Sequence, residues 1–414
     1  MSWVYRGVLD FGLKKLVQTG TLHVMWPDST HSTYGNGQGA SAGIRINTKA
    51  ALRHLALNPG LALGEAYMDG GITVTSGGIH DVLYVVMENM GQSSSMPIMR
   101  LREQALRWLR PVLQANSALR AKRNVAHHYG LNGRLYSLFL DRDRQYSCAY
   151  FPRGDETLEE AQAAKKRHIA AKLKLDQPGL TVLDIGCGWG GMALTLAREF
   201  GASVTGITLS EEQLAAARAR AEEAGLSGRV RFELMDYRAM DRQFDRIVSV
   251  GMFEHVGVPN YPAFCATMKR CLKPDGVALL HSIGRFEGPG ATNEWVAKYI
   301  FPGGYSPALS EVMGPIERSG LLATDIEILR LHYAKTLTHW RRRFAANRDA
   351  ITTIYDERFC RMFEFYLSSS ELAFRLSDHM NFQIQLTRSR EALPLARDYM
   401  YEQEHREKIA EAGE

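Results

Sequence analysis

Residues Thr181–Gly191 read TVLDIGCGWGG and join a short apolar strand to a glycine-rich turn and the start of a helix. Gly186, Gly188 and Gly190 allow a tight turn with close approach of the backbone to a ligand. The helix that follows directs unpaired N–H groups at an electron-rich group. The pattern predicts a nucleoside-cofactor site with Asp184 as an orienting carboxylate, although a dinucleotide fold or a plain strand–helix junction also contains these parts.

The second strand separates these alternatives. A nicotinamide-binding unit needs an acidic residue about 20 positions on, at the end of that strand, to hold the ribose hydroxyls. Residues Ala202–Thr208 read ASVTGIT, and no carboxylate ends them. Thr208 and Gln213 are instead suited to hydrogen-bond a ribose or a methionine moiety, while Ser210 is suited to cap the next helix. S-adenosylmethionine is therefore preferred over NAD as the cofactor.

Two more strands continue the pattern. Residues 230–236 read VRFELMD and deliver Asp236 and Tyr237 where an adenine can be bound by a hydrogen bond and a ring contact. Residues 244–250 read FDRIVSV and run toward Glu254. Four strands at regular spacing, each followed by a helical pattern, predict an α/β fold with a doubly wound parallel sheet.

A set of segments, taken in order, resembles the cyclopropane-fatty-acyl-phospholipid synthases. The segments are YSCAYF at Tyr146–Phe151, LDIGCGWGG at Leu183–Gly191, ITLSEEQ at Ile207–Gln213, FDRIVSVGMFEHVG at Phe244–Gly257, LLHSIG at Leu279–Gly284, KYIFPGG at Lys298–Gly304 and HYAKTL at His332–Leu337. Mycolic acid cyclopropane synthases and fatty-acid C-methyltransferases share this cofactor fold. The resemblance implies a mostly parallel seven-stranded sheet of the class I methyltransferase type, helical insertions that form an acyl pocket, and a smaller N-terminal α+β domain.

The resemblance also implies an activity and a site. The activity is transfer of a methylene from S-adenosylmethionine to a cis double bond of a phospholipid acyl chain, with bound bicarbonate as the base. The residues that match the bicarbonate site are Cys148, Glu254, His281, Ile283 through its backbone, and Tyr333. Tyr146 and Ser147 are implied as further cofactor contacts. By chemistry, His281 and Tyr333 can donate to an anion, Cys148 can donate weakly, and Glu254 can accept the bicarbonate hydroxyl proton.

Each of these side chains also has a plain structural interpretation. Cys148 alone suits a small buried hydrophobe, His281 a core histidine with satisfied hydrogen bonds, and Tyr333 ordinary packing. Glu254 follows a strand at the edge where open α/β sheets carry active-site groups, so a functional role is favoured there. His255 is equally suited to supporting the cofactor region and to packing.

Aromatic residues near the expected mouth of the site can act in two ways. They are Tyr146, Trp295, Tyr299, Phe301 and Tyr305. Their π faces can stabilise a passing cation, but lining for an acyl chain is the preferred role for most of them. Many members of the family carry a cysteine near the position of Ser370. Its absence here argues against a cysteine base and favours the bicarbonate scheme.

Length and composition bound the organisation of the chain. At 414 residues it fits two domains, which we expect at residues 1–98 and 124–414 with a basic helical linker at 99–123. The spacing of its five cysteines suggests neither a zinc site nor a disulfide framework, so we expect no metal and a cytoplasmic location. No window approaches about 18 uninterrupted apolar residues, so any work on lipid must be peripheral.

Most charged residues of the predicted linker are basic. Glu103 is the single acid between Arg100 and Arg123, and Trp108 and several leucines lie among the basic residues. Such a helix suits an anionic membrane surface, here the inner face, and it equally suits a solvated helix between domains. The first 98 residues are expected to be associated with lipid or membrane. No nucleic-acid fold is recognised, and the resemblance implies a homodimer.

Two rival functions remain open at this stage. A C-methyltransferase on the same substrate would resolve the same cation as a methyl or methylene branch. A lipid-binding or membrane-remodelling protein would keep the cofactor fold without turnover. Product analysis separates the first rival from ring closure, and a titration with S-adenosylmethionine separates the second from both enzymes.

Overall fold

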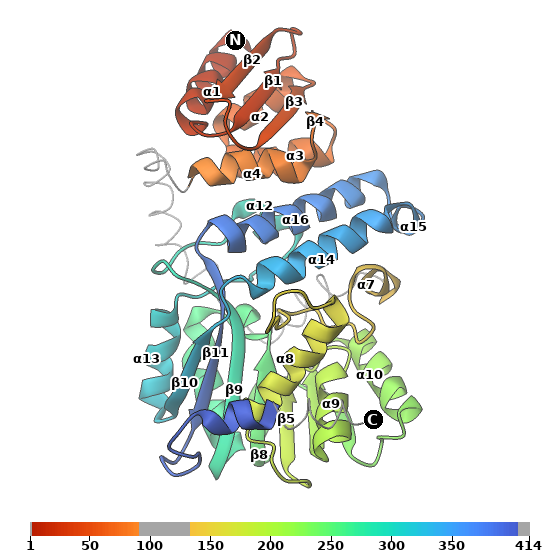
Figure 1. Cartoon of the computed structure of the whole chain (residues 1–414), viewed down its shortest axis with the longest axis vertical. Coiled ribbons are helices and arrows are strands. Elements are labelled where there is room, and N and C mark those ends of the chain that lie inside the picture. Colours follow the sequence, from red (N-terminus) through yellow and green to blue (C-terminus); the bar gives the residue numbers. More distant parts are fainter. Residues whose placement is uncertain (1, 91–132, 405–414) are drawn as a thin grey trace. The chain divides into compact units, whose positions relative to one another are not determined.

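The computed structural model describes residues 2–90 and 133–404 (Figure 1). These residues form two compact units. The first unit holds residues 2–90, 291–302 and 337–379, and the second holds residues 133–290, 303–336 and 380–404. The units differ from the predicted domains, because two segments of the predicted catalytic domain belong to the first unit. The predicted loop at 91–97, the basic linker at 99–123 and the boundary at 124 lie outside the described residues.

A seven-stranded sheet forms the centre of the second unit. Its strands are β5 (Thr181–Ile185), β6 (Ser203–Thr208), β7 (Val230–Leu234), β8 (Phe244–Val250), β9 (Leu272–Arg285), β10 (Leu322–Ile328) and β11 (His379–Thr387), in the order β10-β11-β9-β8-β5-β6-β7. Strands β5 to β9 pair in parallel, whereas β10 and β11 are antiparallel. The predicted mostly parallel sheet is confirmed.

Helices cover both faces of this sheet. They are α7 (Gly133–Phe139), α8 (Leu158–Lys172), α9 (Gly191–Phe200), α10 (Glu211–Glu223), α11 (Tyr261–Cys271), α13 (Leu309–Ser319) and the first residues of α14 (His332–Ala346). Val182 of β5 packs in one core cluster with Leu196 of α9. Its neighbour Leu183 packs in another cluster with Phe264 of α11 and Ile316 of α13. Because successive strand residues point to opposite faces, the sheet is doubly wound, as predicted.

Strand β5 lies at the point where the strand order reverses. The next strand along the chain, β6, lies on one side of it, and β8 lies on the other. Open α/β sheets bind ligands beyond the carboxyl ends of their strands at such a point. Because β5 ends at Ile185 and α9 begins at Gly191, the glycine turn lies at this position.

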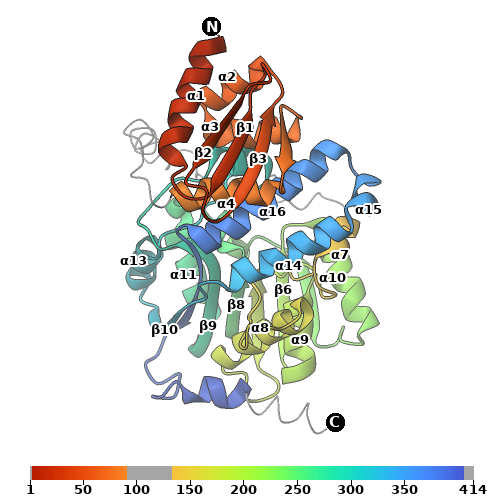
Figure 2. The same cartoon turned by 45° about the horizontal axis from the view of Figure 1, so that its top comes forward.

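The first unit combines a small mixed sheet with helices from three segments of the chain (Figure 2). Its strands are β1 (Thr21–Met25), β2 (His31–Gly35), β3 (Ser41–Ile46) and β4 (Ile72–Ser76), in the order β2-β1-β3-β4. Its helices are α1 (Ser2–Leu16), α2 (Lys49–Leu57), α3 (Pro59–Met68), α4 (Ile79–Met90), α12 (Glu294–Tyr299), α15 (Arg348–Thr352), α16 (Glu357–Leu376) and most of α14. The predicted smaller N-terminal domain of helices and strands is therefore present.

Packing against α3 and α4 explains why α12 and α16, from later segments of the chain, belong to the first unit. Both helices contact α16, and α3 also contacts α12. The Tyr67 hydroxyl donates to Glu364 at 2.8 Å, and the Lys298 ammonium contacts Glu65 at 2.6 Å. A β-carbon at Gly64 would lie 2.3 Å from the Trp295 ring nitrogen, so only glycine permits this approach of α3. These contacts join residues more than two hundred positions apart.

Candidate active site

The glycine turn after β5 has the conformation that the sequence predicts. Gly186, Gly188 and Gly190 have φ angles of 83°, 53° and 83°, in the region that side chains with a β-carbon rarely adopt. A β-carbon at Gly186 would meet the Met252 side chain at 2.8 Å. The backbone N–H groups of Gly186 and Cys187 both donate to the carbonyl of β6 residue Ile207 at 3.0 Å, which fixes the turn to the sheet.

A pocket opens beside this turn. All predicted cofactor residues except Gly190 line it: Tyr146, Ser147, Asp184, Gly186, Gly188, Thr208, Gln213, Asp236 and Tyr237. Gly190 instead permits close packing, since a β-carbon at this position would lie 2.7 Å from the Phe232 ring. His255 lines the pocket too, and burial lowers its pKa to about 4. The sequence did not single out the lining residues Arg144, Gln145 and Trp189.

The end of β6 presents hydroxyl and amide groups to the pocket. Thr208 Oγ1 donates to Gln213 Oε1 at 2.9 Å and accepts from the Ser210 N–H at 3.1 Å. Ser210 caps α10 by accepting from the Gln213 N–H at 3.3 Å. These bonds hold the Gln213 side chain at the pocket wall, where its amide suits ribose hydroxyls.

At the end of β7, Asp236 and Tyr237 form the next part of the wall. Asp236 caps a short helical turn and accepts from the guanidinium of Arg238 at 2.9 and 2.7 Å. Burial would raise the pKa of Asp236, but the hydrogen bonds from Arg238 outweigh it and hold that pKa below its usual value. The Tyr237 ring contacts Phe264 edge-on at 5.3 Å between centroids, which fixes the ring plane.

Asp184 is the carboxylate within the pocket whose charge is least compensated. It is 2% exposed, and its Oδ2 atom has no hydrogen-bond partner among the described residues. Burial raises its pKa to about 7, against the opposing effect of the Lys165 ammonium. A neutral carboxyl in the free protein would ionise when a cationic ligand arrives, because the ligand favours the charged form.

We expect this ionisation to make cofactor affinity depend on pH. S-adenosylmethionine carries a sulfonium charge, so its binding selects ionised Asp184 and releases a proton below about pH 7. The dissociation constant should rise by about tenfold per pH unit below about pH 7 and level off above it. Calorimetry in buffers of different ionisation enthalpy measures both the affinity and the proton release.

The matched variants separate Asp184 from its neighbours. Asp184→Asn should bind S-adenosylmethionine more weakly and without the proton release. Burial also raises the pKa of Glu254 to about 7, and Glu254→Gln should keep the dependence. A proton release that persists in Asp184→Asn and disappears in Glu254→Gln would contradict the assignment.

Lys165 of α8 is a buried cation that the sequence analysis did not identify. It is 0% exposed and donates to Gln145 Oε1 at 2.7 Å and to Ser147 Oγ at 2.9 Å. Burial lowers its pKa to about 8. Its charge opposes the burial that raises the pKa values of Cys148 and Asp184, and it adds to the burial that lowers the pKa of His281.

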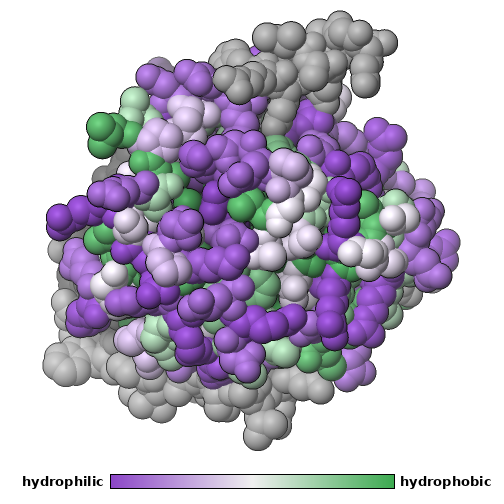
Figure 3. Space-filling model, turned by 90° about the horizontal axis from the view of Figure 1, so that it is seen from below, coloured by the Kyte–Doolittle hydropathy of each residue, from purple (hydrophilic) through white to green (hydrophobic). Residues whose placement is uncertain are grey.

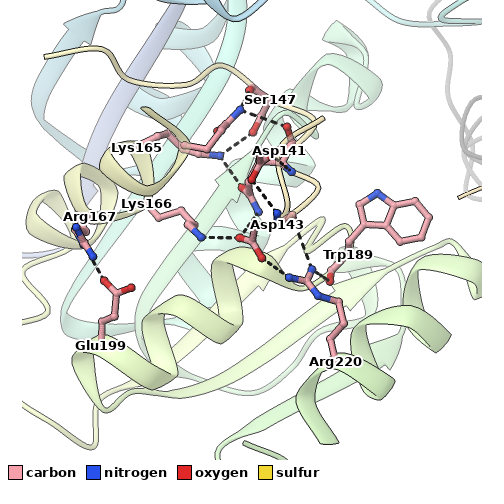
Figure 4. Close-up of polar contacts among 11 residues, drawn as sticks. Asp141, Asp143, Ser147, Lys165, Lys166, Arg167, Trp189, Glu199 and Arg220 are labelled. Carbon is pink, nitrogen blue, oxygen red and sulfur yellow. Dashed lines mark hydrogen bonds and ion pairs between the residues drawn. The ribbon is translucent and has the colours of Figure 1, made fainter. Parts of the chain in front are cut away.

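The segment from Asp141 to Ser147 is held by a second set of charges, which are partly buried (Figure 4). Asp143 contacts the Lys166 ammonium at 2.5 Å and also pairs with Arg220 of α10. Arg220 donates to the carbonyl of Trp189 in the glycine turn at 2.7 Å. The segment that carries Gln145 and Ser147 is thereby tied to α8, α10 and the cofactor turn at once.

Glu254 and Ile283 form the centre of the predicted anion cradle. Glu254 Oε1 accepts from the Ile283 N–H at 2.6 Å, so this backbone donor, expected to face bicarbonate, already has a protein partner. Glu254 is 9% exposed, and its Oε2 atom has no partner among the described residues. Burial raises its pKa to about 7. Near neutral pH the carboxyl is therefore divided between its two protonation states.

His281 lies on the same strand as Ile283 and faces polar groups of β11. Its Nδ1 atom lies 3.1 Å from the amide nitrogen of Gln383. Burial lowers the pKa of His281 to about 3, so the ring is neutral and carries one N–H at physiological pH. The Oε1 atom of Gln383 and the Oδ1 atom of Asn381 lack partners within the described part of the chain. Buried polar atoms without partners mark this region as one where a polar ligand gains hydrogen bonds.

The segment that carries Cys148 contacts the first turn of α14, the helix on which Tyr333 lies. The Ala149 N–H donates to the hydroxyl of Thr336 at 3.0 Å, one helical turn beyond Tyr333. Cys148 is 1% exposed and Tyr333 is 7% exposed. Burial raises the pKa of the Cys148 thiol well above its usual value, so the sulfur stays protonated and suits weak donation to an anion more than nucleophilic attack.

The predicted aromatic residues do not form one group within a single unit. Tyr146 and Tyr305 belong to the second unit, whereas Trp295, Tyr299 and Phe301 belong to the first. Tyr146 lines the cofactor pocket, and the Tyr305 hydroxyl donates to Glu311 at 2.6 Å. Trp295 is buried against the Phe365 ring. The predicted acyl lining therefore stays a prediction.

The sheet order and the pocket at its switch point are those of the class I methyltransferase fold. Coclaurine N-methyltransferase bound to N-methylheliamine and S-adenosylhomocysteine has the same fold, with a TM-score of 0.64 at 20% identity over 78% of this chain and 98% of that one. At this identity the likeness shows the fold alone.

The chain belongs to the mycolic acid cyclopropane synthetase family, whose model matches residues 116–384. Residues 11–96 match a domain family of unknown function. The cyclopropane-fatty-acyl-phospholipid synthase of Escherichia coli is 38% identical over 84% of this chain and 88% of its own length. A probable fatty acid methyltransferase of Pseudomonas putida is 42% identical over 60% of this chain and 65% of its own length.

Solved structures of the same family agree with this membership. The cyclopropane synthase MmaA2 from Mycobacterium tuberculosis has a TM-score of 0.61 at 34% identity, over 64% of this chain and 97% of that one. The mycolic acid cyclopropane synthase CmaA1, in complex with S-adenosylhomocysteine and CTAB, gives the same values.

Proposed function

We propose that this protein transfers a methylene from S-adenosylmethionine to a cis double bond of a phospholipid acyl chain and leaves a cyclopropane. The buried Glu254 carboxyl, bonded to the Ile283 N–H and with one oxygen unpartnered, is the observation that carries the proposal. The Escherichia coli relative, a cyclopropane-fatty-acyl-phospholipid synthase, supports the substrate class. The enzyme works as a peripheral protein at the inner face of an anionic membrane, in the cytoplasm, and as a homodimer.

The residues of the pocket fit S-adenosylmethionine. Asp184 supplies a buried carboxyl that favours a cation once ionised, and Gln213 and Asp236 supply the polar groups at the ends of β6 and β7. Tyr146 and Ser147 close the pocket from the segment that Lys165 and Asp143 fix. When bound, the cofactor supplies an activated methyl group on a sulfonium. The protein's task is to hold that cation and to keep water away from it.

The cradle residues fit a small anion such as bicarbonate. Glu254 Oε2 would provide an acceptor, and the hydroxyl of Tyr333 and the N–H of neutral His281 would provide donors. The thiol of Cys148 would be a further donor in place of its bond to the Ala149 carbonyl at 3.3 Å. Bound bicarbonate would supply the base. A sulfonium would alkylate this anion less readily than an exposed protein carboxylate. Glu254 would accept a hydrogen bond from the hydroxyl of the anion and orient it, which would offset the repulsion between the two negative groups.

A second candidate function is a fatty-acyl C-methyltransferase. The Pseudomonas putida relative, a probable fatty acid methyltransferase, favours it. Both reactions begin with the same methyl addition and differ in how the resulting cation is resolved. Proton loss from the new methyl with bond formation to the cationic carbon closes a ring. Proton loss from a neighbouring chain carbon leaves a methyl-branched alkene, and a hydride shift followed by proton loss from the methyl leaves a methylene branch.

The decisive experiment follows labelled methyl groups into lipid. Purified protein is incubated with vesicles of unsaturated phospholipid and methyl-labelled S-adenosylmethionine. Label should appear in the acyl chains, and proton NMR should show the upfield signals of cyclopropane protons. Vinyl or branched-methyl signals would support the second function. Label confined to water-soluble products, or no binding of S-adenosylmethionine by calorimetry, would defeat both.

A further inference from the structure

Helix α1 of the first unit carries an exposed apolar stripe. Trp3 is 78% exposed, Val4 44%, Val8 53% and Phe11 58%. These positions recur at helical spacing, so their side chains lie along one face of the helix. Large apolar side chains exposed singly are common, but a continuous stripe on one element marks an interaction surface.

The fold does not need this stripe to hold α1 in place. The opposite side of the helix packs on α2 and contacts β2 and α4. The Tyr34 hydroxyl donates to Asp10 at 2.7 Å, and Arg6 pairs with Asp28 at 2.6 Å. Polar anchors and packing on one face therefore leave the apolar face to solvent.

The charges beside the stripe are positive. Lys14 and Lys15 continue the exposed face at its C-terminal end, and the Lys15 ammonium lies 4.7 Å from the centre of the Phe11 ring. Lys49 and Arg53 are exposed on α2, which packs beside α1. Asp10 of the same helix is partly buried and pairs with Lys14 at 2.7 Å, so its negative charge is compensated within α1.

We propose that α1 binds the surface of an anionic phospholipid bilayer, with the stripe of Trp3, Val4, Val8 and Phe11 in the interfacial region and Lys14 and Lys15 against the headgroups. This proposal rests on the proposed phospholipid substrate and names the element that brings the enzyme to it. Indole at one end and ammonium groups at the other are the side chains that favour the boundary between acyl chains and water. No helix of the described chain is long and apolar enough to cross a bilayer, so the contact is shallow.

A bilayer fits this surface better than a second copy of the chain does. Stable protein interfaces bury about 800 Å² per partner, contributed by about 20 to 30 residues on each side. Four apolar side chains on one 15-residue helix fall far short of that number. A bilayer needs no matching surface, and anionic headgroups complement the lysines. The face shown in Figure 3, in contrast, is largely hydrophilic with hydrophobic residues scattered singly.

The test measures vesicle binding apart from catalysis. The full chain with Val8→Ser and Phe11→Ser, and separately Trp3→Ser, is sedimented with vesicles of phosphatidylglycerol and phosphatidylethanolamine in the absence of cofactor. Binding should fall by about tenfold or more in the double variant. Leu395→Ser, at a fully exposed leucine of the second unit, is the matched control and should bind as the wild type does.

The charge is tested separately from the stripe. Lys14→Gln with Lys15→Gln should weaken binding to the anionic vesicles and leave binding to vesicles of phosphatidylcholine unchanged. All stripe variants should keep the wild-type circular dichroism and melting temperature, because the substituted side chains are exposed. They should also keep wild-type turnover on phospholipid dispersed in detergent, where no bilayer has to be found.

Unchanged vesicle binding by the stripe variants would overturn the proposal. If those variants also had a lower mass by light scattering, the stripe would be an interface between copies. Failure of the proposed function has a different signature, since a wild-type protein that binds vesicles through α1 but transfers no label to lipid would keep this inference and remove the activity.

Discussion

Replacing Glu254 with Gln is expected to lower turnover by about 10³-fold while the affinity for S-adenosylmethionine stays within about threefold of the wild type. Glutamine keeps the volume of the side chain and an oxygen that can accept from the Ile283 N–H, now at 2.6 Å. It loses the charge and the proton-accepting oxygen. The effect should therefore appear after the cofactor has bound, in the handling of the proton that leaves.

Kinetics and calorimetry on the same preparation check this result. Single-turnover transfer of labelled methyl to phospholipid gives the chemical step, and titration gives the cofactor dissociation constant. Glu317→Gln is the control, since this exposed carboxylate of α13 lies in the same unit. Equal losses of turnover and cofactor affinity in Glu254→Gln would mean that the carboxyl belongs to the cofactor site and not to the cradle.

Local sequence was sufficient to predict the cofactor half of the fold. The glycine turn, the Ser210 cap and the end of β7 at Asp236 depend on residues within a few positions of one another. Backbone conformation and capping follow from such neighbours. This is why most of the predicted cofactor residues line one pocket.

The buried charges around that pocket could not be predicted in the same way. Helix α8 reads LEEAQAAKKRHIAAK and has no clear apolar face, because Lys165, Lys166 and His168 are buried along with its alanines. Surface helices normally place lysines in water. What makes these lysines stable inside is Asp143 and Gln145, from a segment about twenty residues earlier, whose positions the helical pattern does not reveal.

The division of the chain into these two units could not be predicted from the sequence for the same reason. Trp295 and Glu364 lie in the C-terminal part of the chain, and their partners Gly64 and Tyr67 lie in the N-terminal domain. A domain prediction from sequence order assigns each segment to the domain of its neighbours in the sequence. Packing between α3, α12 and α16 instead depends on long-range complementarity, which one sequence without its relatives does not display.

The segment that closes the cofactor pocket provides the second large effect. Asp143→Asn is expected to weaken S-adenosylmethionine binding by about thirtyfold, or ~2 kcal/mol. Asp143 joins Lys166 and Arg220, and their side chains are 23%, 10% and 25% exposed. Burial would raise the pKa of Asp143, but the two cations outweigh it and lower that pKa, so the carboxylate is charged at neutral pH. An asparagine leaves both cations without their shared counter-ion.

Loss of the Asp143 carboxylate should weaken cofactor binding because Asp143 holds the backbone of residues that line the pocket. Gln145 and Ser147 line the pocket, and Arg220 connects Asp143 to the carbonyl of Trp189 in the glycine turn. Calorimetry should show the weaker binding, and the melting temperature should fall as well. Glu199→Gln is the control, because Figure 4 shows its ion pair with Arg167 beside this cluster, where both side chains are more exposed. Equal affinities in the two variants would show that the segment stays in place without Asp143, and the cofactor site would then depend on the glycine turn alone.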